Sequence, residues 1–354
     1  MRHRPLPSAA HPLSERHRLD TKALQPLLRE HGFPGPVTAE QFKGGQSNPT
    51  YLLTGRGGRL VLRAKPGPAA KLLPSAHAIE REFRVITALS RAGFPVPRTR
   101  FLCEDESVIG RAFYVMDYVE GRVLWEQSLP GLGRAERGAV YDEMNRVIAA
   151  LHRVDYAGLG LADFGRPGNY FARQIGRWSR QYRASETARI DEMDRLIAWL
   201  PEHVPEGDET AIVHGDFRMD NLIFHPTEPR ILAVLDWELS TLGHPLADFS
   251  YHCMSWHIPP GKFRGIAGLD LESLGIPRES DYIASYCART GREEIGNWNF
   301  YLAYNLFRIA AILQGVAKRA LEGTASSAQA QDAGSRARPL AELGWKYAEK
   351  AMKG

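Results

Sequence analysis

Short apolar runs that alternate with polar residues dominate the first third of the chain and are typical of β-strands. Two such runs, 50–54 and 59–63, flank the segment Gly55-Arg56-Gly57-Gly58, which predicts a β-hairpin. Apolar residues then recur at helical spacing over 75–92, and Gly93 and Pro95 follow directly. The pattern predicts a hairpin followed by one amphipathic helix.

Two further strand-like runs, around 98–103 and 112–118, complete this part, and the character of the chain changes after Gly121. The longest helical patterns that follow cover 134–152, 170–200 and 280–320. Short β-like runs lie between them, within 211–236. We therefore predict an α+β protein with a small antiparallel sheet-and-helix lobe over 21–118 and a larger, mainly helical lobe over 119–354.

Two segments lack a periodic pattern. Residues 1–20 carry basic groups and prolines but no apolar stretch, so we predict a flexible tail rather than a targeting signal. Residues 323–338 are small and polar, which predicts a loop. No stretch approaches the roughly 18 apolar residues of a membrane span, and we expect no membrane contact.

Composition narrows the function classes. The 354 residues carry a formal net charge of only +4, which gives no argument for nucleic acid as a partner. The three cysteines, Cys103, Cys253 and Cys287, are odd in number and form no C-x-x-C pair, so neither a disulfide framework nor a zinc ribbon is expected. A reducing, cytoplasmic location fits this usage.

The densest chemical signal lies within residues 212–223, where one apolar run enters a polar loop and a second run leaves it. Asp216 and Asn221 stand five residues apart in this loop, and Asp236 ends the next apolar run. Phosphoryl transfer needs one carboxylate at the attacking hydroxyl, and a second carboxylate and an amide at the metal. The Asp-x₄-Asn spacing with a later aspartate matches a kinase catalytic loop, whereas turn capping alone would leave Asp236 unexplained.

These residues are the basis of a family resemblance. His214-Gly215-Asp216 through Asn221, with Leu235-Asp236-Trp237-Glu238, resembles the aminoglycoside phosphotransferase and choline kinase-like family. The resemblance implies a bilobal protein-kinase-like fold, with ATP in the cleft and Mg²⁺ at the phosphates. It implies that Asp216 is the catalytic base, that Asn221 and Asp236 are the metal ligands, and that Asp248 supports the catalytic loop. His214 is expected to be an architectural hydrogen-bonding group.

The resemblance also places the nucleotide in the first lobe. A phosphate-covering loop is expected at Gly45, Gln46, Ser47 and Asn48. Where the family has a lysine on the third strand, this sequence has Arg63, although Lys65 shares the same strand face and stays an alternative phosphate contact. Glu82 is the expected helix partner, in preference to Glu80.

The segment 113–121 resembles the family hinge between lobes. Its backbone at Asp117 and Val119 is expected to pair with adenine, and Met116 to lie behind the adenine ring. Filling of the hydrophobic core explains Met116 equally well.

The acceptor follows from a narrower resemblance. Strings such as Val61-Leu62-Arg63 and 306–315 resemble kinase-like domains found fused to acyl-CoA dehydrogenases, which implies a hydroxyacyl-CoA acceptor. Residues 301–354 hold eight Lys/Arg and four Asp/Glu, a net +4 that suits an anion. Tyr301, Asn305 and Arg308 share one helix face and are the candidate acceptor contacts, with packing between helices as the alternative.

Two rival functions remain. Asp248 follows Asp236 by only twelve positions, too short a span for a protein kinase activation segment, so a protein kinase is disfavoured. A kinase of an aminoglycoside or of choline is the alternative to a hydroxyacyl-CoA kinase. A catalytically inactive nucleotide-binding module is the rival from another class. It is suggested by Arg63, which stands where the family has a lysine. The presence of Asp216, Asn221 and Asp236 argues against it.

Overall fold

The computed structural model describes residues 19–42, 48–66, 78–261, 263–322 and 330–353. The described chain forms two compact units. The first extends to Trp125 and also includes Asp155–Ala162 and Met219–Ser240. The second consists of Glu126–Val154, Asp163–Arg218 and the chain from Thr241 onward.

A five-stranded antiparallel sheet, ordered β1-β2-β3-β5-β4, forms the centre of the first unit. Its strands are β1 (Val37–Gln41), β2 (Thr50–Gly55), β3 (Gly58–Ala64), β4 (Thr99–Cys103) and β5 (Phe113–Asp117). The predicted hairpin is confirmed, because β2 and β3 pair directly around the turn, with Gly55 opposite Gly58. Gly58 has a φ of 110°, a backbone conformation that glycine adopts without steric cost.

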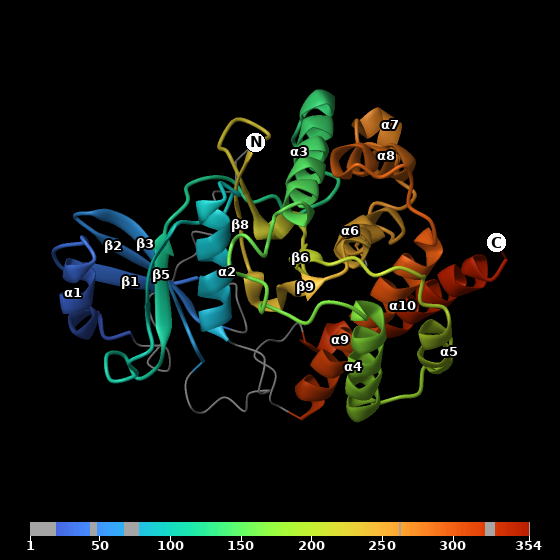
Figure 1. Ribbon diagram of the computed structural model, residues 1–354, viewed down its shortest axis with the longest axis horizontal. Coiled ribbons are helices and arrows are strands. Elements are labelled where there is room, and N and C mark those ends of the chain that lie inside the picture. The colour runs from blue at the N-terminus through green and yellow to red at the C-terminus, as the bar shows by residue number, and fades with distance from the viewer. Residues whose placement is uncertain (1–18, 43–47, 67–77, 262, 323–329, 354) are drawn as a thin grey trace. The chain divides into compact units, whose positions relative to one another are not determined.

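Two helices cover opposite faces of this sheet (Figure 1). The helix α1 (Thr21–Glu30) places Leu24 and Leu28 against alternate strand residues such as Leu62 and Val115. The helix α2 (Ile79–Arg91) packs on the other face, where Arg63 and Tyr114 contact Glu82. The period-two alternation of β3 and β5 therefore divides the sheet into an apolar face and a face that carries polar chemistry.

A short β-hairpin completes the first unit. The strands β7 (Leu222–Phe224) and β8 (Ile231–Val234) pair antiparallel, and a 3₁₀ turn, Trp237–Leu239, follows. Gly121 packs so tightly on this hairpin that a Cβ there would lie 2.3 Å from the carbonyl oxygen of Phe224. Only glycine permits this approach, so the segment after β5 can pack on the hairpin because Gly121 has no side chain.

Helices build most of the second unit, around a two-stranded ladder of β6 (Ala211–Val213) and β9 (Thr241–Gly243). The helices are α3 (Arg134–His152), α4 (Tyr170–Ser185), α5 (Asp191–Trp199), α6 (Pro245–Cys253), α7 (Leu271–Leu274), α8 (Glu279–Thr290), α9 (Trp298–Leu321) and α10 (Ala330–Ala351). Within this unit α9 packs against α4, α6 and α10 (Figure 1). The core of the unit is therefore built around α9.

Two sequence expectations were wrong in this unit. The segment predicted as a loop over 323–338 is helical from Ala330 onward, because alanine, glutamine and arginine favour helix and α10 packs along α9. Contrary to the expectation for apolar stretches, α9 is long and apolar enough to span a membrane by length and composition. In the structure 78% of its apolar window is buried, as in a core helix.

Candidate active site

The β7–β8 hairpin of the first unit brings Asn221 and Asp236 to the same end of its ladder. Asn221 immediately precedes β7, and its carbonyl oxygen accepts a hydrogen bond of 2.8 Å from the N–H of Leu235. Asp236 follows with a φ of 66°, a left-handed conformation that is uncommon for aspartate. Strained backbone of this kind is concentrated at functional sites, where it aims a side chain.

A carboxylate and an amide suit Mg²⁺, a hard cation that takes one or two carboxylates and completes its octahedron with phosphate and water oxygens. In the part of the chain that the structure describes, no group of three or more His, Cys, Asp or Glu side chains is arranged to hold a metal. Asn221 and Asp236 supply one amide and one carboxylate, which fits the few protein ligands that a nucleotide-bound Mg²⁺ takes.

Arg63 is the charged centre of the first unit. Its Nε lies 2.8 Å from a carboxylate oxygen of Glu82, and its terminal nitrogen lies 2.9 Å from Asp236 and 3.4 Å from Glu238. Burial alone would lower the pKa of Arg63, but the surrounding carboxylates, Glu82 first, outweigh it and raise that pKa. Arg63 therefore stays positively charged beside the predicted metal ligand.

Lys65, the alternative phosphate contact, lies in a different environment. Its ammonium group pairs with Glu80, and both side chains are about one-third exposed. The two cations of β3 are thus matched to different carboxylates of α2. Of the two, Arg63 is the one that is buried and pairs with Asp236. Which of them contacts phosphate stays a prediction.

Glu82 is held by further polar groups. The side-chain amide of Asn48 donates to one carboxylate oxygen at 2.7 Å, and the hydroxyl of Tyr114 donates to the other at 3.2 Å. Asn48 is the described end of the predicted phosphate-covering loop. Its partners Gly45, Gln46 and Ser47 lie outside the described residues, and nucleotide contact by this loop stays a prediction.

The predicted hinge residues end β5 and follow it. Met116 is buried, and the N–H of Asp117 donates to the carbonyl of Arg98 at 2.8 Å. The carboxylate of Asp117 pairs with Arg100. Val119 is partly buried on the segment that leads to Gly121. Adenine pairing by this segment stays a prediction.

The second unit holds the loop that carries Asp216. Asp248 of α6 accepts hydrogen bonds from the backbone N–H of His214 at 2.7 Å and of Gly215 at 2.8 Å, and contacts His152 of α3 at 3.3 Å. Burial would raise the pKa of Asp248, but the hydrogen bonds and the charge of the histidines lower it instead. This buried carboxylate anchors the loop, as the resemblance implied.

Both carboxylate oxygens of Asp216 are engaged. The hydroxyl of Tyr251 donates to Oδ1 at 2.5 Å, and Nε of Arg218 lies 2.9 Å from Oδ2. Burial raises the pKa of Tyr251, so its hydroxyl stays protonated and acts as a donor to the carboxylate. The result is a carboxylate held in one orientation, with its side chain still 18% exposed.

Tyr251 is the residue that sequence reasoning missed. It lies three positions after Asp248 on α6, so both side chains project from one face of that helix toward the same loop. The spacing from Asp248 was the available signal. It was hidden because a tyrosine among apolar residues is ordinarily read as core.

Arg308 also holds the loop. It is only 5% exposed, and its guanidinium donates to the carbonyl of Gly215 at 2.6 Å. The same guanidinium lies over the rings of Tyr251 and Trp178, at 5.3 and 5.8 Å from their centroids. A buried cation needs such compensation.

The other two predicted acceptor contacts on α9 face neighbouring helices. The amide of Asn305 donates to the carbonyl of Ala247 and to the hydroxyl of Ser250, both on α6. The Tyr301 ring packs against Phe171 of α4. The structure thus shows packing partners for this face, and acceptor binding by Tyr301, Asn305 and Arg308 stays a prediction.

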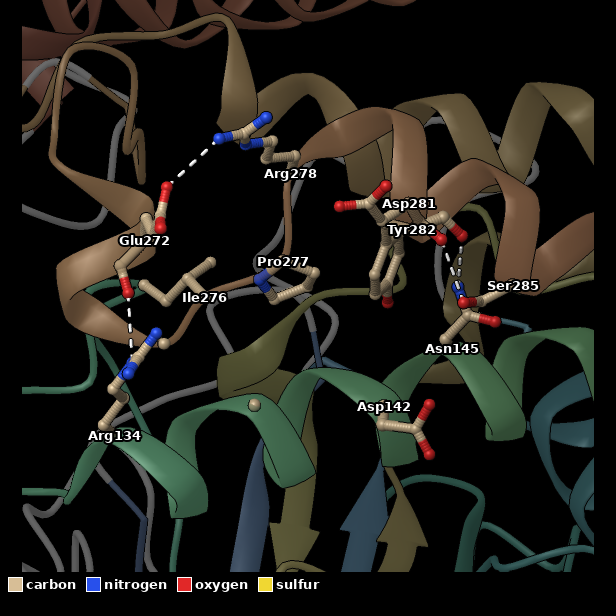
Figure 2. Close-up of a pocket in the computed structure, with 12 residues that line it drawn as sticks. Arg134, Asp142, Asn145, Glu272, Ile276, Pro277, Arg278, Asp281, Tyr282 and Ser285 are labelled. Carbon is tan, nitrogen blue, oxygen red and sulfur yellow. Dashed lines mark hydrogen bonds and ion pairs between the residues drawn. The ribbon is translucent and has the colours of Figure 1, made fainter.

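A separate cavity of about 430 Å³ lies in the second unit, between α3 and the segment from α7 to α8. Figure 2 shows two contacts of Glu272 at its edge: its carbonyl oxygen accepts from Arg134, and its carboxylate pairs with Arg278. Asn145 donates to the carbonyl of Tyr282. None of the predicted site residues lines this cavity.

Comparison with known proteins places this geometry in a family. The model of the "phosphotransferase enzyme family" matches residues 38–280. A Ralstonia eutropha crystal structure, provisionally assigned as an aminoglycoside phosphotransferase, is 63% identical, covers 94% of this chain and 99% of its own, and has a TM-score of 0.87.

Two further similar proteins differ widely in their sequence identity to this chain. Mouse acyl-CoA dehydrogenase family member 10 is 51% identical over 331 residues, which are 93% of this chain but 31% of that protein. The aminoglycoside phosphotransferase APH(4)-Ia, in a complex with ADP and hygromycin B, is 16% identical with a TM-score of 0.59, and covers 91% of this chain and 97% of its own. That likeness shows the shared protein-kinase-like α+β fold. The chain belongs to the phosphotransferase enzyme family.

Proposed function

We propose that this chain is an ATP-dependent kinase that transfers the γ-phosphate to a hydroxyl group of a small molecule. The observation that carries the proposal is the Asp216 carboxylate, which Tyr251 and Arg218 orient on a loop anchored by Asp248. A positioned carboxylate of this kind can accept a proton from an attacking hydroxyl. The Asn221 and Asp236 pair supplies the oxygen ligands that nucleotide-bound Mg²⁺ requires.

The residues divide the reaction between them. Asp216 takes the proton of the acceptor hydroxyl while the oxygen of that hydroxyl forms a bond to the γ-phosphorus. The bond from that phosphorus to the β,γ-bridging oxygen breaks, and its electron pair leaves with ADP. When bound, Mg²⁺ supplies charge that neutralises the β- and γ-phosphate oxygens. Arg63, held by Glu82, adds a fixed positive charge on the nucleotide side.

For the acceptor we propose a hydroxyacyl-CoA. Two observations support it: the 51% identity to a mouse protein named as an acyl-CoA dehydrogenase family member, and the net +4 of residues 301–354. The chain spans between about a third and a half of the length of the curated relatives it matches.

The acceptor test is a direct comparison. The chain is given Mg·ATP with a 4-hydroxyacyl-CoA, the free hydroxy acid, choline and an aminoglycoside, and phosphorylated products are measured by mass spectrometry. We expect the CoA thioester to be phosphorylated most efficiently. Efficient phosphorylation of choline or of the aminoglycoside, without the thioester, would overturn the acceptor and leave the kinase intact.

The second experiment separates a kinase from an inactive nucleotide-binding module. We expect Asp216→Asn to lower turnover by about 10²–10⁴-fold, the usual contribution of a general base, while ATP binding is retained. The control is Asp191→Asn, an exposed carboxylate of the same unit, which should leave turnover unchanged. Turnover of Asp216→Asn within about threefold of wild type would remove Asp216 from the base role.

A further inference from the structure

One face of α4 carries arginine and no compensating acid. The helix contains Arg173, Arg177, Arg180 and Arg183 and not a single Asp or Glu. At 100° per residue these four positions fall within an arc of about 120°, opposite the buried face that includes Trp178. We call Arg177, Arg180 and Arg183 the arginine face.

The arginine face is exposed, and none of its three side chains forms an ion pair with a carboxylate among the residues that the structure describes. Arg173 differs, because it donates to the carbonyls of Gly168 and Arg166. Like charges three or four residues apart on a helix repel each other. A patch of uncompensated positive charge of this kind attracts an anion.

Arg177, at the edge of the arginine face, lies near the residues that hold the catalytic loop within the second unit. The guanidinium of Arg177 is 5.3 Å from the centroid of the Trp178 ring, and that of Arg308 is 5.8 Å from the same centroid. The two guanidinium carbons are therefore at most about 11 Å apart. Arg308 in turn binds the carbonyl of Gly215, the residue before Asp216. Of the arginine face, Arg177 is therefore the side chain that the structure places near this loop.

We infer that the arginine face binds the phosphate groups of the acceptor, a CoA thioester. Guanidinium groups bind phosphate oxygens through paired N–H donors, and side chains three or four positions apart lie about 5–6 Å from each other, close enough to share neighbouring phosphates. This inference rests on the proposed function. It states that the acceptor owes its affinity for this chain to its phosphates rather than to its acyl chain.

The test compares two acceptors that carry the same hydroxyacyl group. One is the CoA thioester, and the other is the N-acetylcysteamine thioester, which has no phosphate. For the double variant Arg177→Gln/Arg180→Gln we expect the KM for the CoA thioester to rise about 10- to 100-fold, as expected for lost charge-assisted hydrogen bonds, with kcat within about twofold. Kinetics with the N-acetylcysteamine thioester should not change.

Arg195→Gln is the matched control. Arg195 is an exposed arginine of α5 whose guanidinium lies over a tryptophan, Trp345, just as Arg177 lies over Trp178. Its replacement should leave both acceptors unaffected, and Arg177→Lys/Arg180→Lys should retain part of the affinity because it keeps the charge.

Two results would overturn the inference and leave the proposed acceptor intact. One is an unchanged KM for the CoA thioester in the double variant, and the other is an equal rise in KM for both thioesters. If the wild-type chain phosphorylates no CoA thioester at all, the proposed acceptor fails first, and the inference fails with it.

Discussion

The hydroxyl group of Tyr251 and the guanidinium of Arg218 help to orient the Asp216 carboxylate. Tyr251 donates to one carboxylate oxygen and Arg218 contacts the other. The proton of the acceptor must reach this carboxylate, so its orientation matters for the proposed base role. Tyr251 acts on the Asp216 carboxylate through this hydrogen bond, so we class it as a positioning residue.

We predict that Tyr251→Phe lowers kcat about 10- to 100-fold with little change in the KM for ATP, because one hydrogen bond to a charged group is lost. The same substitution in an Asp216→Asn background should cause no further loss, since Tyr251 acts through that carboxylate. Both effects are measured by steady-state kinetics on the single and double variants.

Tyr347→Phe is the control for stability. Tyr347 is a buried tyrosine of the same unit, and its hydroxyl lies 2.5 Å from Nδ1 of His257. Its removal should lower the melting temperature about as much as Tyr251→Phe but leave kcat unchanged. Additive losses in the Tyr251→Phe/Asp216→Asn double variant would show that Tyr251 does not act through Asp216.

At the scale of elements, the sequence pattern predicted those elements that form through interactions between residues close together in the chain. The β2–β3 hairpin and α2 follow from alternation, helical spacing and glycine placement, and both formed as predicted. The start of α10 at Ala330 did not follow, because its packing along α9 is a long-range effect that a small, polar segment does not reveal. The predicted boundary at residue 118 stays a prediction.

The candidate site shows the same division. Asp216, Asn221 and Asp236 were found because their spacing within one segment is itself the signal. Tyr251 and the arginine face were not, since their importance arises from what other elements place beside them. The packing of α6 on the catalytic loop and of α4 against α9 is set by the fold, and no local motif encodes it.

Two histidines around α6 make the stability of the second unit pH-dependent. Burial lowers the pKa of His244, the N-cap residue, and of His252 to about 4 each. In the unfolded chain a histidine titrates near 6.5. Between about pH 4 and 6.5 the unfolded state therefore binds more protons, and stability falls as the pH is lowered through this window.

We predict that the free energy of unfolding falls by about 1–3 kcal/mol per histidine between pH 7 and 4, and that His252→Gln removes part of this slope. Denaturant titrations at several pH values measure it. The exposed His31→Gln is the control and should leave the slope intact. An unchanged slope in His252→Gln would mean that His252 is not the buried neutral group described above.

At the scale of the whole molecule, the chemistry is divided between two compact units. The first holds Arg63, Asn221 and Asp236, and the second holds Asp216 and the arginine face. Each unit has its own core, and the segment 216–221 passes from one to the other along the chain. Nucleotide and acceptor are therefore expected to stabilise different parts of the protein.

Mg·ATP should stabilise the first unit through Asp236. A ligand that binds only the folded state raises the melting temperature with its concentration, so the shift reports nucleotide affinity without any acceptor or turnover. We predict that Asp236→Ala abolishes the shift given by Mg·ATP, because a charged ligand is removed from a hard cation.

Arg63 retains Glu82 and Glu238 as partners in that variant, so the loss should not reflect an unpaired buried charge. Glu228→Ala, an exposed carboxylate at the turn of the same β7–β8 hairpin, is the control and should keep the full shift. Hydrogen exchange with Mg·ATP should then show protection in β3, α2 and the β7–β8 hairpin of wild type and not of Asp236→Ala. An equal shift and equal protection in Asp236→Ala would remove Asp236 from the metal site, whatever the acceptor proves to be.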